Sequence, residues 1–462
     1  MNAGSFGVNY YSGFAKVSFD GFINENYFEL NPQEKNLIAN LEIYHGVAKN
    51  PLNFQKDLFL GFLVKSKYDG VGGRQPIDLS IALDVSGSMS SIDDSKIGKS
   101  RLTLAKEGLK KLVSILDEND RASLITFNHE IQKLFTLNKK EDIETKFLHD
   151  IDAIRANGGT DLLGAVAAAM ENFSNETDGP NKLRRILCIT DAYYSDDNNA
   201  LYNLIKKCVE EKNISITFMA IGSDSNLDLA DKLCDFKGCN YFPITKSEEL
   251  ESYLSTNFKN IFFPMAHNTK ITVLCKNNDA KISKCIGASN PEANINAKNE
   301  SIFNFGSCFP SEIISLKEGA EEKKYINGGI VLLKVEVPSN EKIDFEFNLE
   351  YESIDGKKSS QNYEYEIPVD KLDINYFSNS NIQKGISIFY FTEVLNSFVE
   401  KAKKLRENEN EEEKKKEIEF IENAQSVKDY LQKNFIFNKN DEESKKEDWR
   451  GMDTTLSWRW TR

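Results

Sequence analysis

The sequence has few of the residues that build metal clusters or disulfide frameworks. Its 462 residues include only four histidines and seven cysteines, and no two cysteines have CxxC spacing. Cys234 and Cys239 lie close together, but neither a second cysteine pair nor enough histidines are present to complete a tetrahedral zinc site. We therefore expect reduced, mostly buried thiols.

Long apolar runs are also lacking. No run approaches the roughly eighteen uncharged apolar residues that a membrane-spanning helix needs. The first residues do not follow the charged, apolar and small-residue order of a secretory signal. These absences predict a soluble, cytoplasmic chain that does not insert into a membrane.

Positive charge is in the minority and is not concentrated in a patch. The chain has 58 lysines and arginines against 72 aspartates and glutamates, a formal net charge of −14. Since each phosphate contact needs a lysine or arginine, this balance argues against nucleic acid or an anionic membrane as the main partner. Hydrophobic residues make up 40% of the chain, which is enough for at least one full core.

From Pro76 to about Pro264, short apolar runs alternate with amphipathic segments. We expect strands at 77–84, 121–127, 131–137 (a short edge strand), 184–190, 214–222 and 240–244, and helices at 101–117, 140–154, 161–172, 198–212, 226–234 and 247–262. Strands that alternate with helices through short loops require right-handed crossovers. The region is therefore predicted to be a doubly wound α/β domain with a mainly parallel, Rossmann-like sheet.

The flanking regions have strand-like alternation. Expected strands lie at 36–46 and 58–66 before the α/β domain, and at 269–276, 280–287, 328–338, 342–353 and 361–369 after it. Because a few strands cannot bury a face alone, we expect both groups to form one antiparallel β-sandwich into which the α/β domain is inserted. Residues 373–404 read as a helix. The expected domains are 1–75 (N-terminal strands), 76–264 (α/β domain), 265–370 (β-sandwich), 371–436 (helical region) and 437–462 (Trp-rich tail).

The string DVSGSMS follows the first strand of the α/β domain. It places one carboxylate, from Asp84, and two hydroxyls, from Ser86 and Ser88, on a tight loop at the crevice beyond the strand ends. Gly87 lets this loop turn without a Cβ clash. Hard oxygen atoms at this spacing suit Mg²⁺ or another hard divalent cation, such as Mn²⁺ or Ca²⁺.

Two further oxygen-bearing residues are expected at the same edge of the sheet. Thr160 follows a pair of glycines before a helix, and Asp191 closes the strand that contains ILCIT. The carboxyl ends of parallel strands meet at one sheet edge, so the three loops should converge. The predicted metal site therefore consists of Asp84, Ser86, Ser88, Thr160 and Asp191.

These residues resemble the metal-ion-dependent adhesion site of von Willebrand factor A (vWA) domains, and the resemblance covers about residues 76–264. It implies that Ser86 and Ser88 bind the metal directly and that Asp84 binds it directly or through water. It also implies that Thr160 and Asp191 alternate between direct and water-mediated contact. The remaining metal position is left for an acidic side chain of a partner protein.

The chain departs from this pattern after Asp191. Ala192 stands where many relatives carry glycine, and the following residues 193–197 add tyrosines and aspartates beside the crevice. With Asp93 and Asp94, those aspartates would repel an incoming carboxylate unless a metal is bound. Metal-independent binding of an acidic ligand is therefore not expected.

The wider arrangement is similar to intracellular and bacterial proteins that set a vWA domain against a β-sandwich. It is also similar to plant ubiquitin ligases that combine such a domain with a RING finger. The RING is missing here because no CxxC pair exists, so ligase activity does not carry over.

Three enzyme-like or binding signals were weighed beside the metal site. Residues 97–100 end like a phosphate-binding loop, but Asp93 occupies the position of its first glycine, and Ser100 is better explained as a helix cap. No histidine is marked as a base for Ser86 or Ser88, so no catalytic residue is assigned and no enzyme activity is expected. All three tryptophans lie in the last fourteen residues, where they either anchor a partner or dock back onto the chain.

Two functions remain open from the sequence. The first is a metal-dependent interaction protein that binds an Asp or Glu of a partner protein, with its tail contributing to a multi-protein complex. The second is a structural scaffold subunit of a larger assembly, in which the metal only braces three loops.

Overall fold

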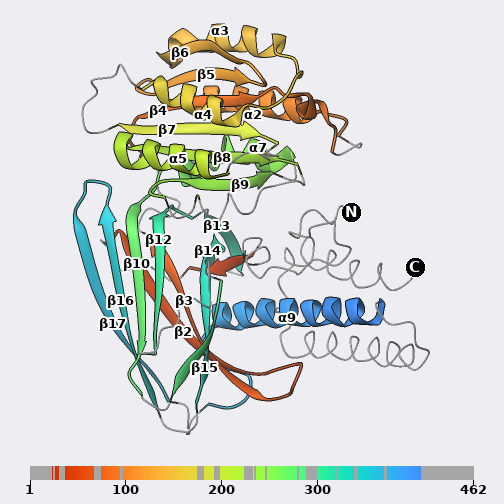
Figure 1. Cartoon of the computed structure of the whole chain (residues 1–462). Helices are drawn as coiled ribbons and strands as arrows, with labels where there is room; N and C mark the ends of the chain where they lie inside the picture. The colour runs from red at the N-terminus through yellow and green to blue at the C-terminus, as the bar shows by residue number, and fades with distance from the viewer. Residues whose placement is uncertain are drawn as a thin grey trace.

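The structure is a computed structural model in which an α/β region lies above antiparallel sheets, with one long helix projecting to the side (Figure 1). It describes Ile23 and the residues from 26 to 406 except those in the gaps named next. These gaps are 31–36, 67–73, 94–96, 174–181, 192–197, 223–232, 234–235, 245–246, 278–279, 288–298, 312, 319–320, 338–341 and 369–371.

The α/β region is built on a six-stranded sheet in the order β6-β5-β4-β7-β8-β9. Its strands are β4 (Ile77–Asp84), β5 (Arg121–Phe127), β6 (Ile131–Lys139), β7 (Leu183–Thr190), β8 (Ile214–Ile221) and β9 (Asn240–Ile244). All neighbours are parallel except β6, which runs antiparallel at the edge. Every residue of β4 is buried, including the polar Asp78, Ser80 and Asp84, as expected for a central strand of a sheet covered on both faces. The predicted mainly parallel α/β fold is confirmed.

Helices cover both faces of this sheet. Residues of α2 (Arg101–Ile115), α3 (Lys140–Ala153), α7 (Ser247–Tyr253) and α8 (Phe258–Phe262) share one core with the sheet. Those of α4 (Leu162–Glu171) and α5 (Asn198–Lys212) share the other. The expected single helix at 247–262 is wrong, because a turn separates α7 from α8. The helix expected at 226–234 falls almost entirely outside the described residues.

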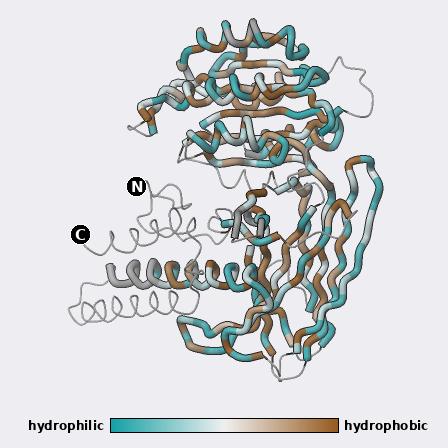
Figure 2. Tube along the Cα trace, turned by 180° about the vertical axis from the view of Figure 1, so that it is seen from behind, coloured by the Kyte–Doolittle hydropathy of each residue, from teal (hydrophilic) through white to brown (hydrophobic). Residues whose placement is uncertain are grey.

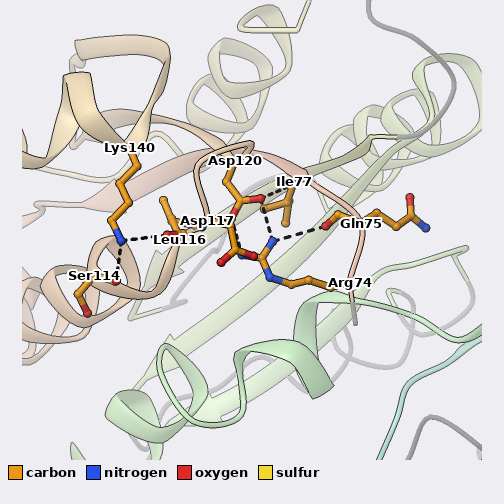
Figure 3. Close-up of polar contacts among 8 residues, drawn as sticks. All are labelled: Arg74, Gln75, Ile77, Ser114, Leu116, Asp117, Asp120 and Lys140. Carbon is orange, nitrogen blue, oxygen red and sulfur yellow. Dashed lines mark hydrogen bonds and ion pairs between the residues drawn. The ribbon is translucent and has the colours of Figure 1, made fainter. Parts of the chain in front are cut away.

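A cluster of hydrogen bonds and ion pairs lies at the end of the sheet where β4 begins. The guanidinium of Arg74 pairs with Asp120, which is fully buried, and lies 2.8 Å from a carboxylate oxygen of Asp117. The backbone N–H of Ile77 donates to Asp120 Oδ1 over 3.0 Å (Figure 3). On the same side Lys140 donates to two carbonyl oxygens at the end of α2. The hydrogen bond from Ile77 to Asp120 fixes the start of β4. The candidate site lies at the opposite end of this strand.

Two antiparallel sheets face each other across a second core. One has the order β12-β10-β16-β17 and the other β11-β15-β3-β2-β18. The ring centroid of Phe62 on β3 lies 5.3 Å from that of Phe303 and 5.8 Å from that of Phe347 on the opposing sheet. The strands are β2 (Ala39–Lys49), β3 (Lys56–Ser66), β10 (Ala266–Cys275), β11 (Lys281–Ile286), β12 (Glu300–Cys308), β15 (Ile330–Glu336), β16 (Ile343–Ser353), β17 (Lys358–Ile367) and β18 (Tyr376–Phe377).

Chain segments from before and after the α/β region share one of these sheets. β3 pairs antiparallel with β15, with Leu60 opposite Leu333, and β2 pairs with β3 along its full length. A third, smaller sheet joins β1 (Tyr27–Glu29) to β14 (Glu321–Asn327) and β13 (Ile313–Glu318). β1, β12, β13, β14 and β18 were not anticipated from the sequence.

Helix α9 (Ser380–Arg406) packs its first turns on the outer face of the β11-β15-β3-β2-β18 sheet. A Cβ on Gly61 would lie 2.5 Å from Ile382 Cδ1, so the absence of a side chain there lets the helix approach the strand. Hydrophobic and hydrophilic residues alternate along the strands of the antiparallel sheets and are mixed along α9 (Figure 2). The helix begins at 380 rather than at the expected 373. Among the described helices, none is long and apolar enough to cross a membrane.

Candidate metal site

The loop after β4 holds Asp84 and Ser86 in a tight, buried arrangement. Asp84 is fully buried and Ser86 is 1% exposed. The backbone N–H of Ser86 donates to Asp84 Oδ1 over 2.7 Å, which turns the chain back over the strand end. A short 3₁₀ helix (Gly87–Ser90) then brings the Ser88 hydroxyl oxygen to 3.0 Å from that of Ser86. Two hydroxyl oxygens and one carboxylate therefore lie together, as the sequence predicts.

The loop that carries Thr160 docks directly on this one. The N–H of Gly87 donates to the carbonyl oxygen of Gly158 over 3.0 Å, and the N–H of Asn157 donates to that of Val85 over 2.8 Å. Gly158 has a φ of +74°, and a Cβ there would lie 2.3 Å from His129 Nδ1. Thr160 is half-buried and stands two residues before α4.

Asp191 reaches the site from the end of β7. It is 5% exposed, and the preceding residue, Thr190, donates its hydroxyl to Asp84 Oδ2 over 2.6 Å. The Arg101 guanidinium, from the first turn of α2, lies 3.2 Å from Asp191 Oδ2. Both oxygens of Asp84 are thus engaged, one by its own loop and one by the neighbouring strand, so the ends of β4 and β7 are tied together.

The electrostatics of Asp84 favour a nearby cation. Burial is the largest cause that raises its pKa above the ordinary value, and the negative charge of Asp191 raises it further. Hydrogen bonds from Thr190 and Ser86 act in the opposite direction. A divalent cation placed between the two carboxylates would relieve both the burial and the repulsion.

The donor atoms fit a hard divalent ion. The five predicted side chains offer only oxygen, from two carboxylates and three hydroxyls, which suits Mg²⁺, Mn²⁺ or Ca²⁺ rather than a soft metal. In the described part of the chain, no three His, Cys, Asp or Glu side chains gather as a metal site. A metal at this edge would therefore depend on the hydroxyls of Ser86, Ser88 and Thr160 in addition to Asp84 and Asp191.

Two residues that contact the candidate ligands, and the ion pair between Arg101 and Asp93, were not predicted from the sequence. Thr190 was read only as the end of a strand and Arg101 only as the start of a helix, yet both contact the predicted ligands. Asp93, expected to repel an acidic partner, instead accepts hydrogen bonds from Arg101 Nε (2.8 Å) and Nη2 (2.7 Å). Asp94 and residues 192–197 lie outside the described residues.

Two smaller predictions can be compared with the structure. The hydroxyl of Ser100 accepts from the N–H of Thr103 over 3.2 Å, which confirms its expected role as the cap of α2. Cys239 is buried, and its sulfur accepts from the N–H of Ile216. Cys234, the other member of the rejected zinc pair, lies outside the described residues.

Part of the α/β region matches a known protein family. The model of the von Willebrand factor type A domain matches residues 79–193, from β4 to just beyond β7. Residues 79–193 match the von Willebrand factor type A family and lie in a region with its fold. Domains of this family are generally protein–protein interaction modules.

Individual relatives share only part of their length with this chain. The uncharacterized protein YfbK of Escherichia coli is 25% identical over 203 residues, which are 42% of this chain and 33% of that protein. The inter-alpha-trypsin inhibitor heavy chain H2 of Sus scrofa is 23% identical over 223 residues, 46% of this chain and 22% of that one. The chain thus spans a third or less of these curated relatives.

Solved structures with a similar fold are distant in sequence. A von Willebrand factor type A protein from Catenulispora acidiphila has a TM-score of 0.42 and 16% identity, covering 74% of this chain and 75% of that one. The ArnB paralog VWA2 from Sulfolobus acidocaldarius has a TM-score of 0.38 and 14% identity, covering 85% and 91%.

Proposed function

We propose that the vWA domain of this chain binds an acidic side chain of a partner protein through a divalent metal ion held by Asp84, Ser86, Ser88, Thr160 and Asp191. Mg²⁺ is the leading candidate, with Mn²⁺ and Ca²⁺ as alternatives of the same oxygen preference. The protein is proposed to act in the cytoplasm and without enzymatic activity.

The observation that carries the proposal is the convergence of three loops on one sheet edge. The Ser86 and Ser88 hydroxyls lie 3.0 Å apart, Thr190 ties Asp84 to the strand that ends at Asp191, and Gly87 is hydrogen-bonded to Gly158 on the Thr160 loop. The packing of a parallel sheet does not by itself require oxygen-bearing residues at the ends of β4 and β7 and in the loop before α4. Coordination of one shared cation would account for these oxygen atoms.

The composition of the site also explains how a bound metal would take up an acid. Three of the five candidate ligands are neutral hydroxyls, so they do not cancel the charge of a divalent ion. Ser88 is exposed and Thr160 half-buried, whereas Asp84 and Asp191 are buried. The more exposed candidate ligands are therefore the neutral hydroxyls of Ser88 and Thr160, and an external carboxylate is proposed to reach the metal from their side.

Binding is favoured over catalysis by the surroundings of the two serines. His129 lies above Gly158, but in the described part of the chain it makes no hydrogen bond to Ser86 or Ser88. A serine nucleophile needs such a base. The second candidate function is a scaffold in which the metal only braces the loops, and it is favoured by the near-complete burial of Asp84 and Ser86.

A capture experiment separates the two functions. Full-length protein is immobilised and exposed to extract in the presence of Mg²⁺ or of a chelator, in parallel with Asp84→Ala. The matched control is Asp152→Ala, whose carboxylate is 66% exposed on α3 and pairs with Lys110. We expect partner capture to require Mg²⁺, to be lost in Asp84→Ala and to persist in Asp152→Ala. Capture that survives both the chelator and Asp84→Ala leaves only the scaffold.

A further inference from the structure

Arg101 places a buried positive charge beside the candidate metal ligands. Its side chain is 10% exposed, and its guanidinium makes a two-point contact with Asp93 and a single contact, from Nη1, with Asp191 Oδ2. The hydrogen bonds to Asp93 raise the pKa of Arg101, so it stays charged at every physiological pH. The site thus contains a permanent cation of its own.

The fold reserves space for this guanidinium. Gly222, at the end of β8, has a φ of +114°, and a Cβ at this position would lie 2.6 Å from Arg101 Nη2 and 2.7 Å from Cζ. The N–H of Gly222 donates to the carbonyl oxygen of Ile244, which holds the strand end in place. Any side chain at residue 222 would displace the guanidinium of Arg101. The position of the guanidinium is therefore set by Asp93, Asp191 and the absence of a side chain at Gly222.

The position of Arg101 has opposite consequences for a metal and for an acid. Two carboxylates, Asp84 and Asp191, could together cancel the charge of a divalent ion. Because Arg101 shares Asp191, part of that negative charge is already balanced, and a metal bound at this edge keeps more positive charge. Like charges repel, so the same arginine makes the metal bind less tightly, while an incoming carboxylate is attracted more strongly.

We propose that Arg101 is a positioning residue that shares Asp191 with the metal, lowering the affinity of the site for the metal and raising the affinity of the bound metal for an acidic ligand. The inference rests on the proposed function, since it concerns the same site. Arg101 is not itself a candidate metal ligand, yet it is proposed to determine how strongly the bound metal attracts an acidic ligand.

The test measures metal and acid separately on the full-length protein. Mn²⁺ binding is titrated by calorimetry, and acetate binding to the Mn²⁺-loaded protein is followed through the relaxation of water protons, because acetate displaces metal-bound water. Arg101→Gln should bind Mn²⁺ about ten-fold more tightly, equivalent to about 1.4 kcal/mol, and acetate several-fold more weakly. Arg101→Lys, which keeps the charge, should restore both affinities towards the wild-type values.

Asp93→Asn provides an independent variant with the opposite expected sign. Asp93 is 41% exposed and removing its charge leaves Arg101 less compensated, so Mn²⁺ should bind more weakly and acetate more strongly. If Arg101→Gln or Asp93→Asn changes both affinities in the same direction, or neither, Arg101 has only a structural role and the inference is overturned. If the wild-type protein binds no Mn²⁺ at all, the proposed function itself fails.

Discussion

The hydroxyl of Thr190 is expected to carry a measurable part of the stability of the α/β region. Thr190 is 1% exposed, and its Oγ1 donates over 2.6 Å to Asp84 Oδ2, inside a fully buried carboxylate environment. Valine has nearly the same shape but no donor, so Thr190→Val leaves one carboxylate oxygen of Asp84 without this hydrogen bond. Hydrogen bonds to charged groups contribute about 1.5–3 kcal/mol. We predict that the free energy of unfolding falls by about 2 kcal/mol.

The assay is urea unfolding of the full-length chain, followed by far-ultraviolet circular dichroism in chelator and again in Mg²⁺. Thr190→Ser retains the hydroxyl and is the matched control, with a smaller loss from the missing methyl group. A metal that binds only the folded state adds stability that rises with the logarithm of its affinity. The deficit of Thr190→Val should therefore grow in Mg²⁺, because Asp84 is no longer held in place. Equal unfolding midpoints for Thr190→Val and wild type would refute the reasoning.

Two further predictions concern the antiparallel sheets. Phe62→Ala should cost about 3–5 kcal/mol of unfolding free energy, because the ring is fully buried between both sheets. Phe54→Ala, at a side chain 64% exposed, should stay within about 0.5 kcal/mol of wild type in the same urea unfolding experiment. Similar losses for both variants would contradict the shared core. Burial lowers the pKa of His267 from 6.5 to about 4, so the unfolded chain takes up the proton first and the stability this residue supports is lost as the pH falls from about 6.5 to 4. The effect is worth up to about 3 kcal/mol, and His267→Asn should remove it; parallel pH-stability curves for variant and wild type would show that His267 titrates normally.

The α/β region could be predicted from the sequence because its strands are buried on both faces. Segment 77–84 lies where short, mainly apolar segments alternate with amphipathic ones, a pattern typical of central parallel strands. Strand β4 begins and ends where expected. The helix expected at 247–262 was wrong because the short polar run Ser255-Thr256-Asn257 favours local turns. There the N–H of Asn257 donates to the carbonyl oxygen of Ser252.

The missed strands depend on contacts that are distant in the chain. β14 is rich in lysine and glutamate and has little strand preference of its own, but it pairs on one side with β13 and on the other with β1, about 300 residues earlier. The two residues of β18 pair with β2, so α9 begins after them and not at the expected residue 373. The pairings of β14 with β1 and of β18 with β2 join distant segments and leave no local periodicity, whereas β13 and β14 form a local hairpin.

The candidate ligands could be predicted because strand ends share one sheet edge, while their supporting residues could not. Asp84 and Asp191 each close a predicted strand, so topology alone brings them together. The partners of Thr190 and Arg101 lie 106 and 90 residues away in the chain, and neither residue type is distinctive at a strand or helix end. A charged residue at the start of the helix after a metal-binding loop is the signal that could have been followed.

We propose above all that hydroxyl and carboxylate oxygens from three loops hold one hard divalent cation. The most direct measurement is calorimetric titration of the full-length protein with Mg²⁺ and Mn²⁺, compared with the double variant Ser86→Ala/Ser88→Ala. Ser114→Ala on α2, whose exposed hydroxyl donates to the carbonyl oxygen of Lys111, controls for loss of a serine elsewhere in the same domain. We expect one metal ion per chain for wild type and Ser114→Ala and no measurable binding for the double variant. Unchanged metal binding in the double variant, or none in wild type, would contradict it.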